Sequence, residues 1–301
     1  MKKITIASRE SRLALWQTHF VRDEIKRKLG LDCEIVTMKT QGDIILDKPL
    51  SQIGGKALFM KELERSMQRG ETSIAVHSLK DVPFALPEGF CLASFMPRED
   101  PRDALVSNNF ISIDDLPKGA VVGTSSLRRK SQLLNYRDDL VVKDLRGNVQ
   151  TRLSKLDGGD YDAIILASAG LIRLGLVDRI AQYIPIEISL PAVGQGIVVI
   201  EALESELELI ESLKKLNDDT SSIVATAERA FNQELQGGCH VAIAAYARVT
   251  ADGIINLQAM VASADGKEIL KMSHSGTNPV DVGTELARQM ISKGAYEILE
   301  K

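Results

Sequence analysis

Short apolar runs alternate with stretches of helical periodicity through residues 3–195, and this alternation restricts the fold more than any other feature of the sequence. The runs KITIAS, CEIVTM and SIAVHSL have the length and composition of buried strands. Residues 11–29 and 56–69 instead repeat apolar side chains at helical spacing, and a glycine follows each stretch. Strands separated by helices indicate βαβ units, so we expect a mostly parallel sheet.

Two breaks divide the chain. The segment MPREDPRDAL, residues 96–105, has two prolines among five charged residues, which is typical of a boundary. The alternation resumes with AVVGTSS, LVVKDLRG and YDAIILAS, and proline and glycine interrupt it again at residues 188–196. We therefore predict a second α/β part between the two breaks.

The last third of the chain has a different pattern. A helix is expected over residues 221–236, and the apolar runs VAIAAYARV, IINLQAMVAS and EILKMSHS follow it. The sequence ADG separates these runs twice, and Asp-Gly between apolar runs is a hairpin signal. A final helix is expected over residues 279–299. The predicted fold class is α/β, with two α/β parts and a small C-terminal α+β part.

The composition excludes several classes of protein. A formal net charge of -4 argues against a general nucleic-acid binder, whose binding domain is basic. Cys33, Cys91 and Cys239 are widely spaced, which suggests neither a metal site nor a disulfide framework and favours a reducing cytosol. No apolar run reaches the ~18 residues of a membrane span, and the apolar run near the N-terminus is too short for a signal peptide.

A basic cluster follows the predicted strand AVVG. In GTSSLRRKSQ, hydroxyl side chains at residues 124–126 precede a predicted helix, whose first backbone N–H groups attract an anion. Arg128 and Arg129 follow in the first turn, where they could hold a carboxylate or phosphate through paired hydrogen bonds. The alternative is that both arginines are solvated surface charges.

A second basic cluster repeats this arrangement. In DLRGNVQTRLSKL, Arg146 ends a predicted strand, Gly147 turns the chain, and Arg152 lies one helical turn further. Arg173 follows the strand AIILAS and could join them. Ligands of open α/β sheets bind outside the carboxyl ends of the strands, so the clusters converge if these strands are parallel.

The first α/β part has polar groups at equivalent positions. Arg9 and Ser11 follow its first strand, and AVHSLKDVP ends a strand with Lys80 and Asp81. Asp81 could accept hydrogen bonds from a substrate or exchange a proton, or it could be a turn-forming aspartate paired with Lys80. His77 is better explained as structural, because no other histidine or cysteine has ligand spacing with it.

Two further features have open interpretations. The long polar segment 40–59 could be a lid from which Lys56 reaches an anion, or a mobile surface loop. Cys239 in LQGGC lies between two glycines and an apolar run. It could be a small buried hydrophobic residue, which is the usual role of a free cysteine, or a chemical attachment point.

These motifs resemble the porphobilinogen deaminase family, also called hydroxymethylbilane synthase. The similarity extends nearly from end to end and includes SRLALWQ, TQGDIILD, GGKALFMKELE, AVHSLKDVP, REDPRDALVS, VGTSSLRRKSQL, LRGNVQTRLSKL, YDAIILASAGL, SLPAVGQG and LQGGC. It implies an enzyme of tetrapyrrole (porphyrin, haem) biosynthesis that joins four porphobilinogen molecules head to tail with release of ammonia.

The resemblance also implies a domain organisation. Two α/β domains resemble type II periplasmic binding proteins with a cleft between them, and a small α+β domain carries the cofactor cysteine. The corresponding ranges are 1–97 with 196–215, then 101–192, and then 218–301.

The resemblance further implies the site residues. Asp81 and Lys80 match the catalytic positions, where the carboxylate holds pyrrole N–H groups and stabilises a positively charged azafulvene. A covalent dipyrromethane cofactor would be attached through Cys239. Residues matching its binding positions are Asp81, Lys80, Ser78, Thr124, Ser125, Ser126, Arg128, Arg129, Arg146 and Gly147. Residues matching substrate-binding positions are Arg9, Ser11, Lys56, Phe59, Arg146, Arg152, Arg173 and Gln195.

The expected protein is a cytoplasmic monomer that acts on a small molecule and binds no metal, nucleic acid or membrane. The alternatives are a solute- or anion-binding protein on the same two-domain scaffold, in which Cys239 has no role, and a catalytically inactive relative kept for regulation. The chain departs from the usual family pattern at two places: His240 and Ala242 follow the cysteine, and Ile197 to Glu201 read IVVIE after VGQG.

Overall fold

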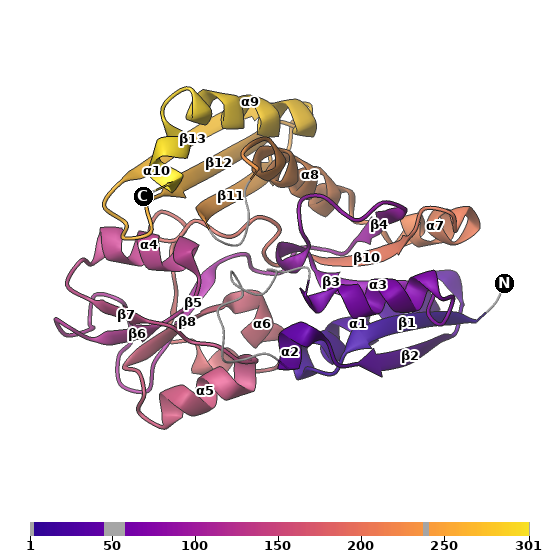
Figure 1. The fold of residues 1–301 in the computed structure, drawn as a ribbon, viewed down its shortest axis with the longest axis horizontal. Helices are drawn as coiled ribbons and strands as arrows, with labels where there is room; N and C mark the ends of the chain where they lie inside the picture. Colours follow the sequence, from indigo (N-terminus) through magenta and orange to yellow (C-terminus); the bar gives the residue numbers. More distant parts are fainter. Residues whose placement is uncertain (1–2, 45–57, 237–240, 301) are drawn as a thin grey trace. The chain divides into compact units, whose positions relative to one another are not determined.

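The computed structural model describes residues 3–44, 58–236 and 241–300. These residues form two compact units (Figure 1). Unit 1 comprises residues 1–99 and 197–222, and unit 2 comprises residues 100–196 and 223–301. In the described part of the chain, no helix combines the length and the apolar composition needed to cross a membrane.

The described residues of unit 1 form a five-stranded sheet with the order β2-β1-β3-β10-β4. The strands are β1 (Ile4–Arg9), β2 (Cys33–Met38), β3 (Ile74–Ser78), β4 (Phe90–Phe95) and β10 (Val198–Leu203). Strand β1 is parallel to β2 and β3, whereas β10 is antiparallel to both β3 and β4. The sheet is therefore mixed rather than mostly parallel, because a strand from the later part of the chain lies between β3 and β4.

Helices cover both faces of this sheet. The helical segments of this part are α1 (Arg12–Leu29), α2 (Gln41–Ile44), α3 (Lys61–Gln68) and α7 (Leu207–Leu213), with the short 3-10 helices η3 (Leu79–Asp81) and η5 (Lys214–Leu216). Ile4 and Ile6 of β1 pack in the core cluster that includes α1, and Ala7 packs in the cluster that includes α3. Alternate residues of a strand point to opposite faces, so α1 and α3 lie on opposite sides of the sheet.

The second α/β part, in unit 2, has the same plan. Its described strands have the order β7-β6-β8-β5-β9. They are β5 (Asp103–Val106), β6 (Val121–Gly123), β7 (Val141–Lys143), β8 (Ala163–Ala167) and β9 (Gln182–Tyr183), with helices α4 (Leu127–Tyr136), α5 (Val149–Asp157), α6 (Ser168–Arg173) and η4 (Val177–Arg179). Strand β6 is parallel to β7 and β8, and β5 is antiparallel to β8 and β9.

The C-terminal part is an antiparallel α+β module. Strands β11 (Ala242–Val249), β12 (Ile255–Ala262) and β13 (Ile269–Gly276) pair in sequence order, which confirms the two predicted hairpins. Its helices are α8 (Asp219–Glu234), α9 (Pro279–Ile291) and α10 (Ala295–Leu299). The single helix predicted over 279–299 was wrong, because Gly294 takes the left-handed conformation with φ 88° and separates α9 from α10. The predicted fold class is confirmed.

The three-stranded sheet packs against helices on both faces. Ala244 and Met260 pack with Leu127 of α4 in one core cluster. On the other face, α9 lies along β12 and β13 (Figure 1). The α+β module and the second α/β part therefore share a buried apolar contact within unit 2.

The close packing of α9 against α8 requires a glycine. A Cβ atom built on Gly283 would lie 2.3 Å from the Ala227 carbonyl oxygen and 2.7 Å from the Phe231 amide nitrogen, and backbone atoms in helices cannot yield as a flexible side chain does. We expect Gly283→Ala to lower the free energy of unfolding by about 1–2 kcal/mol, despite the helix preference of alanine. Urea denaturation measures this change. The exposed neighbour substitution Glu285→Ala should stay within about 0.5 kcal/mol of the parent, and equal stability of the two variants would contradict the prediction.

Candidate functional site

The predicted site residues of unit 1 lie at the carboxyl ends of neighbouring parallel strands. Arg9 is the last residue of β1, and Ser78 is the last residue of β3. Ser11 caps α1 by accepting a hydrogen bond from the Ala14 amide at 3.3 Å. Gln17 of α1 donates a hydrogen bond from Nε2 to Ser78 Oγ at 2.7 Å, so the first helix holds the end of β3 in place.

Phe59 lies against two residues of unit 1. The guanidinium carbon of Arg9 lies 4.2 Å from the centroid of the Phe59 ring, within the range of a cation–π contact. A Cβ atom on Gly42 would lie 2.3 Å from the same ring, so the ring occupies the space above this glycine. The structure therefore brings together Arg9 and Phe59, both predicted substrate-binding residues.

Asp81 has no protein partner in the described part of the chain. It ends the 3-10 helix η3 directly after β3 and is half-buried. No hydrogen bond or ion pair of its carboxylate is present among the described residues, so the pairing with Lys80 that the alternative interpretation required is absent there. The carboxylate is thus able to accept hydrogen bonds from a ligand.

The hydroxyl residues of unit 2 organise the end of β6. Thr124 Oγ1 accepts a hydrogen bond from the Ser126 amide at 3.2 Å. Ser125 Oγ donates to the Leu145 carbonyl at 3.1 Å and accepts from the Leu145 amide at 3.0 Å, which ties the end of β6 to the segment after β7. Ser126 is the N-cap of α4, and its side chain makes no capping hydrogen bond.

The second basic cluster lies at the same edge, because β6, β7 and β8 are parallel. Gly147 has φ 113°, a conformation that favours glycine, and its carbonyl accepts a hydrogen bond from Arg152 Nε at 2.8 Å. Arg146 precedes it and is half-buried. Arg173 is buried at the end of α6 and donates from Nη2 to the Gly196 carbonyl at 2.6 Å.

Arg128 and Arg129 are buried rather than solvated. Their exposed fractions are 5% and 6%, so the surface-charge alternative was wrong. Both guanidinium groups bond to Asp103, which is fully buried: Arg128 Nη1 lies 2.8 Å from Asp103 Oδ2, and Arg129 Nη2 lies 2.7 Å from Oδ1. Gln195 Nε2 donates to the same Oδ1 at 3.0 Å.

Asp103 was not among the site residues predicted from the sequence. It lies in the segment interpreted as a boundary, directly before the apolar residues Ala104 to Val106. In the structure it begins β5, which runs antiparallel to β8 and pairs Asp103 with Ala167, the last residue of β8. The start of an antiparallel strand therefore reaches the edge at which the parallel strands end. An acid before a short apolar run was the available signal.

The group formed by Arg128, Arg129 and Asp103 in unit 2 fits a ligand that carries carboxylates. Arg128 Nε is buried and has no hydrogen-bond partner in the described part of the structure. A buried donor without a partner costs free energy, which an acceptor on a ligand would recover. Two guanidinium groups around one carboxylate also leave a net positive charge, as an acidic ligand requires.

Some predicted residues cannot be placed with the others. Cys239 and Lys56 lie outside the described residues, as does His240 beside the cysteine. The remaining residues divide between unit 1 and unit 2, and their convergence on one ligand stays a prediction. Ala242, the other departure near Cys239, is buried at the start of β11 opposite Ala262.

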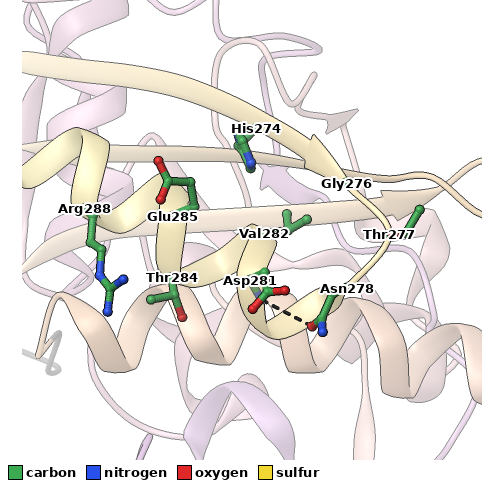
Figure 2. Close-up of a pocket in the computed structure, with 9 residues that line it drawn as sticks. All are labelled: His274, Gly276, Thr277, Asn278, Asp281, Val282, Thr284, Glu285 and Arg288. Carbon is green, nitrogen blue, oxygen red and sulfur yellow. Dashed lines mark hydrogen bonds between the residues drawn. The ribbon is translucent and has the colours of Figure 1, made fainter.

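A separate hollow of about 440 Å³ lies over α9 and the end of β13 (Figure 2). Its lining includes His274, Asn278, Asp281, Glu285 and Arg288 and contains none of the predicted site residues. Asn278 already caps α9, and Arg288 pairs with Glu234 at 2.9 Å. Because Asn278 and Arg288 are engaged within the protein and no predicted site residue lines the hollow, it is not the candidate site.

The described fold is that of an α/β protein in which arginines and hydroxyl groups, with Asp81 in unit 1 and Asp103 in unit 2, lie at the carboxyl ends of parallel strands, where open α/β sheets bind their ligands. Two family models match the chain: "Porphobilinogen deaminase, dipyromethane cofactor binding domain" over residues 4–211 and "Porphobilinogen deaminase, C-terminal domain" over residues 222–292. The chain belongs to the porphobilinogen deaminase family. It is a transferase of the hydroxymethylbilane synthase type with a dipyrromethane cofactor-binding domain.

Similar proteins extend over the full length. The porphobilinogen deaminase of Francisella tularensis subsp. novicida (strain U112) is 72% identical over 300 residues, covering 100% of both chains, and that of subsp. tularensis (strain WY96-3418) is 71% identical over the same length. Among solved structures, the periplasmic VFT2 domain of Bordetella pertussis BvgS has a TM-score of 0.45 at 16% identity and covers 71% of this chain and 86% of its own. A periplasmic substrate-binding protein of a Coxiella burnetii ABC transporter has a TM-score of 0.44 at 12% identity, covering 71% and 91%.

Proposed function

We propose that this transferase condenses four porphobilinogen molecules head to tail, releases ammonia at each addition and yields hydroxymethylbilane. The observation that carries this proposal is the carboxylate of Asp81, which lies at the end of β3 without a partner among the described residues. Full-length similarity to porphobilinogen deaminases gives independent support.

Asp81 is the proposed catalytic group. Its carboxylate accepts hydrogen bonds from a pyrrole N–H and stabilises the positive charge that develops as the amino group of porphobilinogen leaves. A carboxyl group can also carry the proton that the departing amine takes up. Lys80 precedes Asp81 in η3 and is the second residue to which we assign a catalytic role. The dipyrromethane cofactor, when bound, supplies the nucleophilic pyrrole carbon to which the substrate is joined.

The remaining site residues bind the acetate and propionate groups of cofactor and substrate. Arginine suits this task, because its planar guanidinium forms paired hydrogen bonds with a carboxylate. Residues proposed for the cofactor are Ser78, Lys80, Asp81, Thr124, Ser125, Ser126, Arg128, Arg129, Arg146 and Gly147. Residues proposed for the substrate are Arg9, Ser11, Lys56, Phe59, Arg146, Arg152, Arg173 and Gln195.

Cys239 is the proposed attachment residue of the cofactor. Formation of a thioether requires a nucleophilic sulfur, which is best supplied as a thiolate. The two other cysteines are poorly suited, because burial raises the pKa of Cys33 to about 11 and also raises the pKa of Cys91. Both are half-buried in strands of unit 1. We also propose that the enzyme is a cytoplasmic monomer that binds neither nucleic acid nor a membrane.

Intact mass tests the covalent attachment. We expect the protein to be heavier than its sequence by two linked pyrrole units, and we expect Cys239→Ser to have the unmodified mass. Cys91→Ser is the matched control and should retain the added mass. An unmodified parent protein from a host that makes porphobilinogen, or a modified Cys239→Ser variant, would contradict the proposal.

A further inference from the structure

Asp103 is the centre of a buried network in unit 2. Its Oδ2 accepts hydrogen bonds from Arg128 Nη1 and from Ser189 Oγ, both at 2.8 Å. Its Oδ1 accepts from Arg128 Nη2 at 3.2 Å, from Arg129 Nε at 3.0 Å and Nη2 at 2.7 Å, and from Gln195 Nε2 at 3.0 Å. One carboxylate therefore fixes two guanidinium groups, a hydroxyl group and a carboxamide.

Backbone carbonyls complete the positioning of both arginines. Arg128 Nη1 donates to the Leu190 carbonyl at 2.6 Å, and Arg129 Nη1 donates to the Ile165 carbonyl at 3.0 Å. These contacts come from different segments of the second α/β part, and with the bonds to Asp103 they engage both terminal nitrogens, Nη1 and Nη2, of each arginine. In Arg128, the buried Nε alone is left without a partner in the described structure.

The network is unbalanced in charge. Burial raises the pKa of Asp103, but Arg128 and Arg129 lower it further, and the carboxyl group stays ionised well below its usual range. The charged groups that act on Arg128 are Asp103 and Arg129. Two buried positive charges thus face one negative charge, and removing the only counter-charge of a buried pair is strongly destabilising.

We propose that Asp103 is a positioning residue, which holds the guanidinium groups of Arg128 and Arg129 in place and neutralises one of their two charges, so that the other is available to a carboxylate of the bound cofactor. This inference rests on the proposed function, which assigns the two arginines to the cofactor. Asp103 itself is fully buried and acts through the arginines.

The first test is thermal unfolding in a Cys239→Ser background, in which intact mass confirms that no cofactor is attached. Asp103→Asn keeps the shape and removes the charge, so it should lower the Tm by roughly 10 °C. Adding Arg128→Gln restores the original net charge and should recover at least half of this loss. Asp162→Asn is the matched control, because Asp162 Oδ2 accepts a backbone hydrogen bond from Val121 at 2.7 Å and pairs with no arginine in the described structure. If the loss of Tm in the double variant instead equalled the sum of the losses from Asp103→Asn and Arg128→Gln, the proposed charge balance between Asp103 and the arginines would be wrong.

The second test is cofactor loading in the chain with Cys239 intact. Asp103→Glu keeps the charge and displaces it by one methylene, so we expect a folded protein whose cofactor-bearing fraction, measured by intact mass, falls at least twofold relative to the Asp162→Asn control. A fully loaded Asp103→Glu variant would overturn the positioning role. An unloaded parent protein would instead contradict the proposed function. The thermal test would still decide whether Asp103 balances the charge of the two arginines, because it uses protein without cofactor.

Discussion

Asp81→Asn is expected to reduce the turnover number roughly 10²–10⁴-fold without unfolding unit 1. The amide has the shape of the carboxylate, and no described hydrogen bond or ion pair is lost, because the Asp81 carboxylate makes none within the described structure. What is lost is the negative charge that would stabilise the cation formed as the amine leaves. Ammonia release measures turnover, and the Tm reports folding.

Asp32→Asn is the control for this experiment. Asp32 is an exposed acid of unit 1 that pairs with Lys26 at 2.8 Å, and exposed ion pairs contribute little to stability. It should retain the parent activity. Intact mass of Asp81→Asn separates a loss of cofactor from a loss of turnover on a loaded enzyme. A loaded Asp81→Asn variant with turnover close to the parent would remove Asp81 from the mechanism.

The positions of most site residues could be predicted from the pattern of strands and turns. Thr124, Arg146 and Arg173 each follow a predicted strand. Because β6, β7 and β8 are parallel, the carboxyl ends of these three strands lie at one edge of the sheet. The direction of a strand, however, cannot be read from its composition. Asp103 precedes its strand, and only antiparallel pairing with β8 brings it to that edge.

The burial of charged side chains could also not be predicted from the sequence pattern. Two arginines at the start of a helix are commonly solvated, and α4 has no periodicity that would indicate otherwise. Arg128 and Arg129 are buried because Asp103 and two backbone carbonyls from distant segments supply their hydrogen bonds. The topology of the fold, rather than the local sequence, determines these distant hydrogen-bond partners. Similarly, the apolar run of β10 has the composition of a strand but does not specify its place between β3 and β4.

A buried acidic cluster in unit 1 predicts an unusual dependence of stability on pH. Glu64 of α3 has an exposed fraction of 9%, and Glu201 of β10 has none. His77 of β3 lies with Nε2 2.8 Å from Glu201 Oε2. Burial raises the pKa of Glu64 to about 7; Glu201 and Glu62 add to this rise, whereas His77 and Lys61 oppose it.

The direction of the effect follows from proton binding. Below pH 4.5, Glu64 is protonated in both the folded and the unfolded chain. Between pH 4.5 and about 7, the unfolded chain releases the proton while the folded chain retains it, so the free energy of unfolding falls as the pH rises. Each pH unit costs about 1.4 kcal/mol, which gives a loss of about 3 kcal/mol across the interval. The contribution of Glu64 to the free energy of unfolding is fully present below pH 4.5 and is lost above about pH 7.

Glu64→Gln should remove this dependence, because the carboxamide stays neutral at every pH. We expect the variant to match the parent below pH 4.5 and to exceed it by about 3 kcal/mol above pH 7, as measured by urea denaturation at a series of pH values. Glu34→Gln, which removes an exposed carboxylate paired with Lys3, is the control and should follow the parent curve. Parallel pH curves for Glu64→Gln and the parent would show that folding does not raise the pKa of Glu64, and would contradict the prediction.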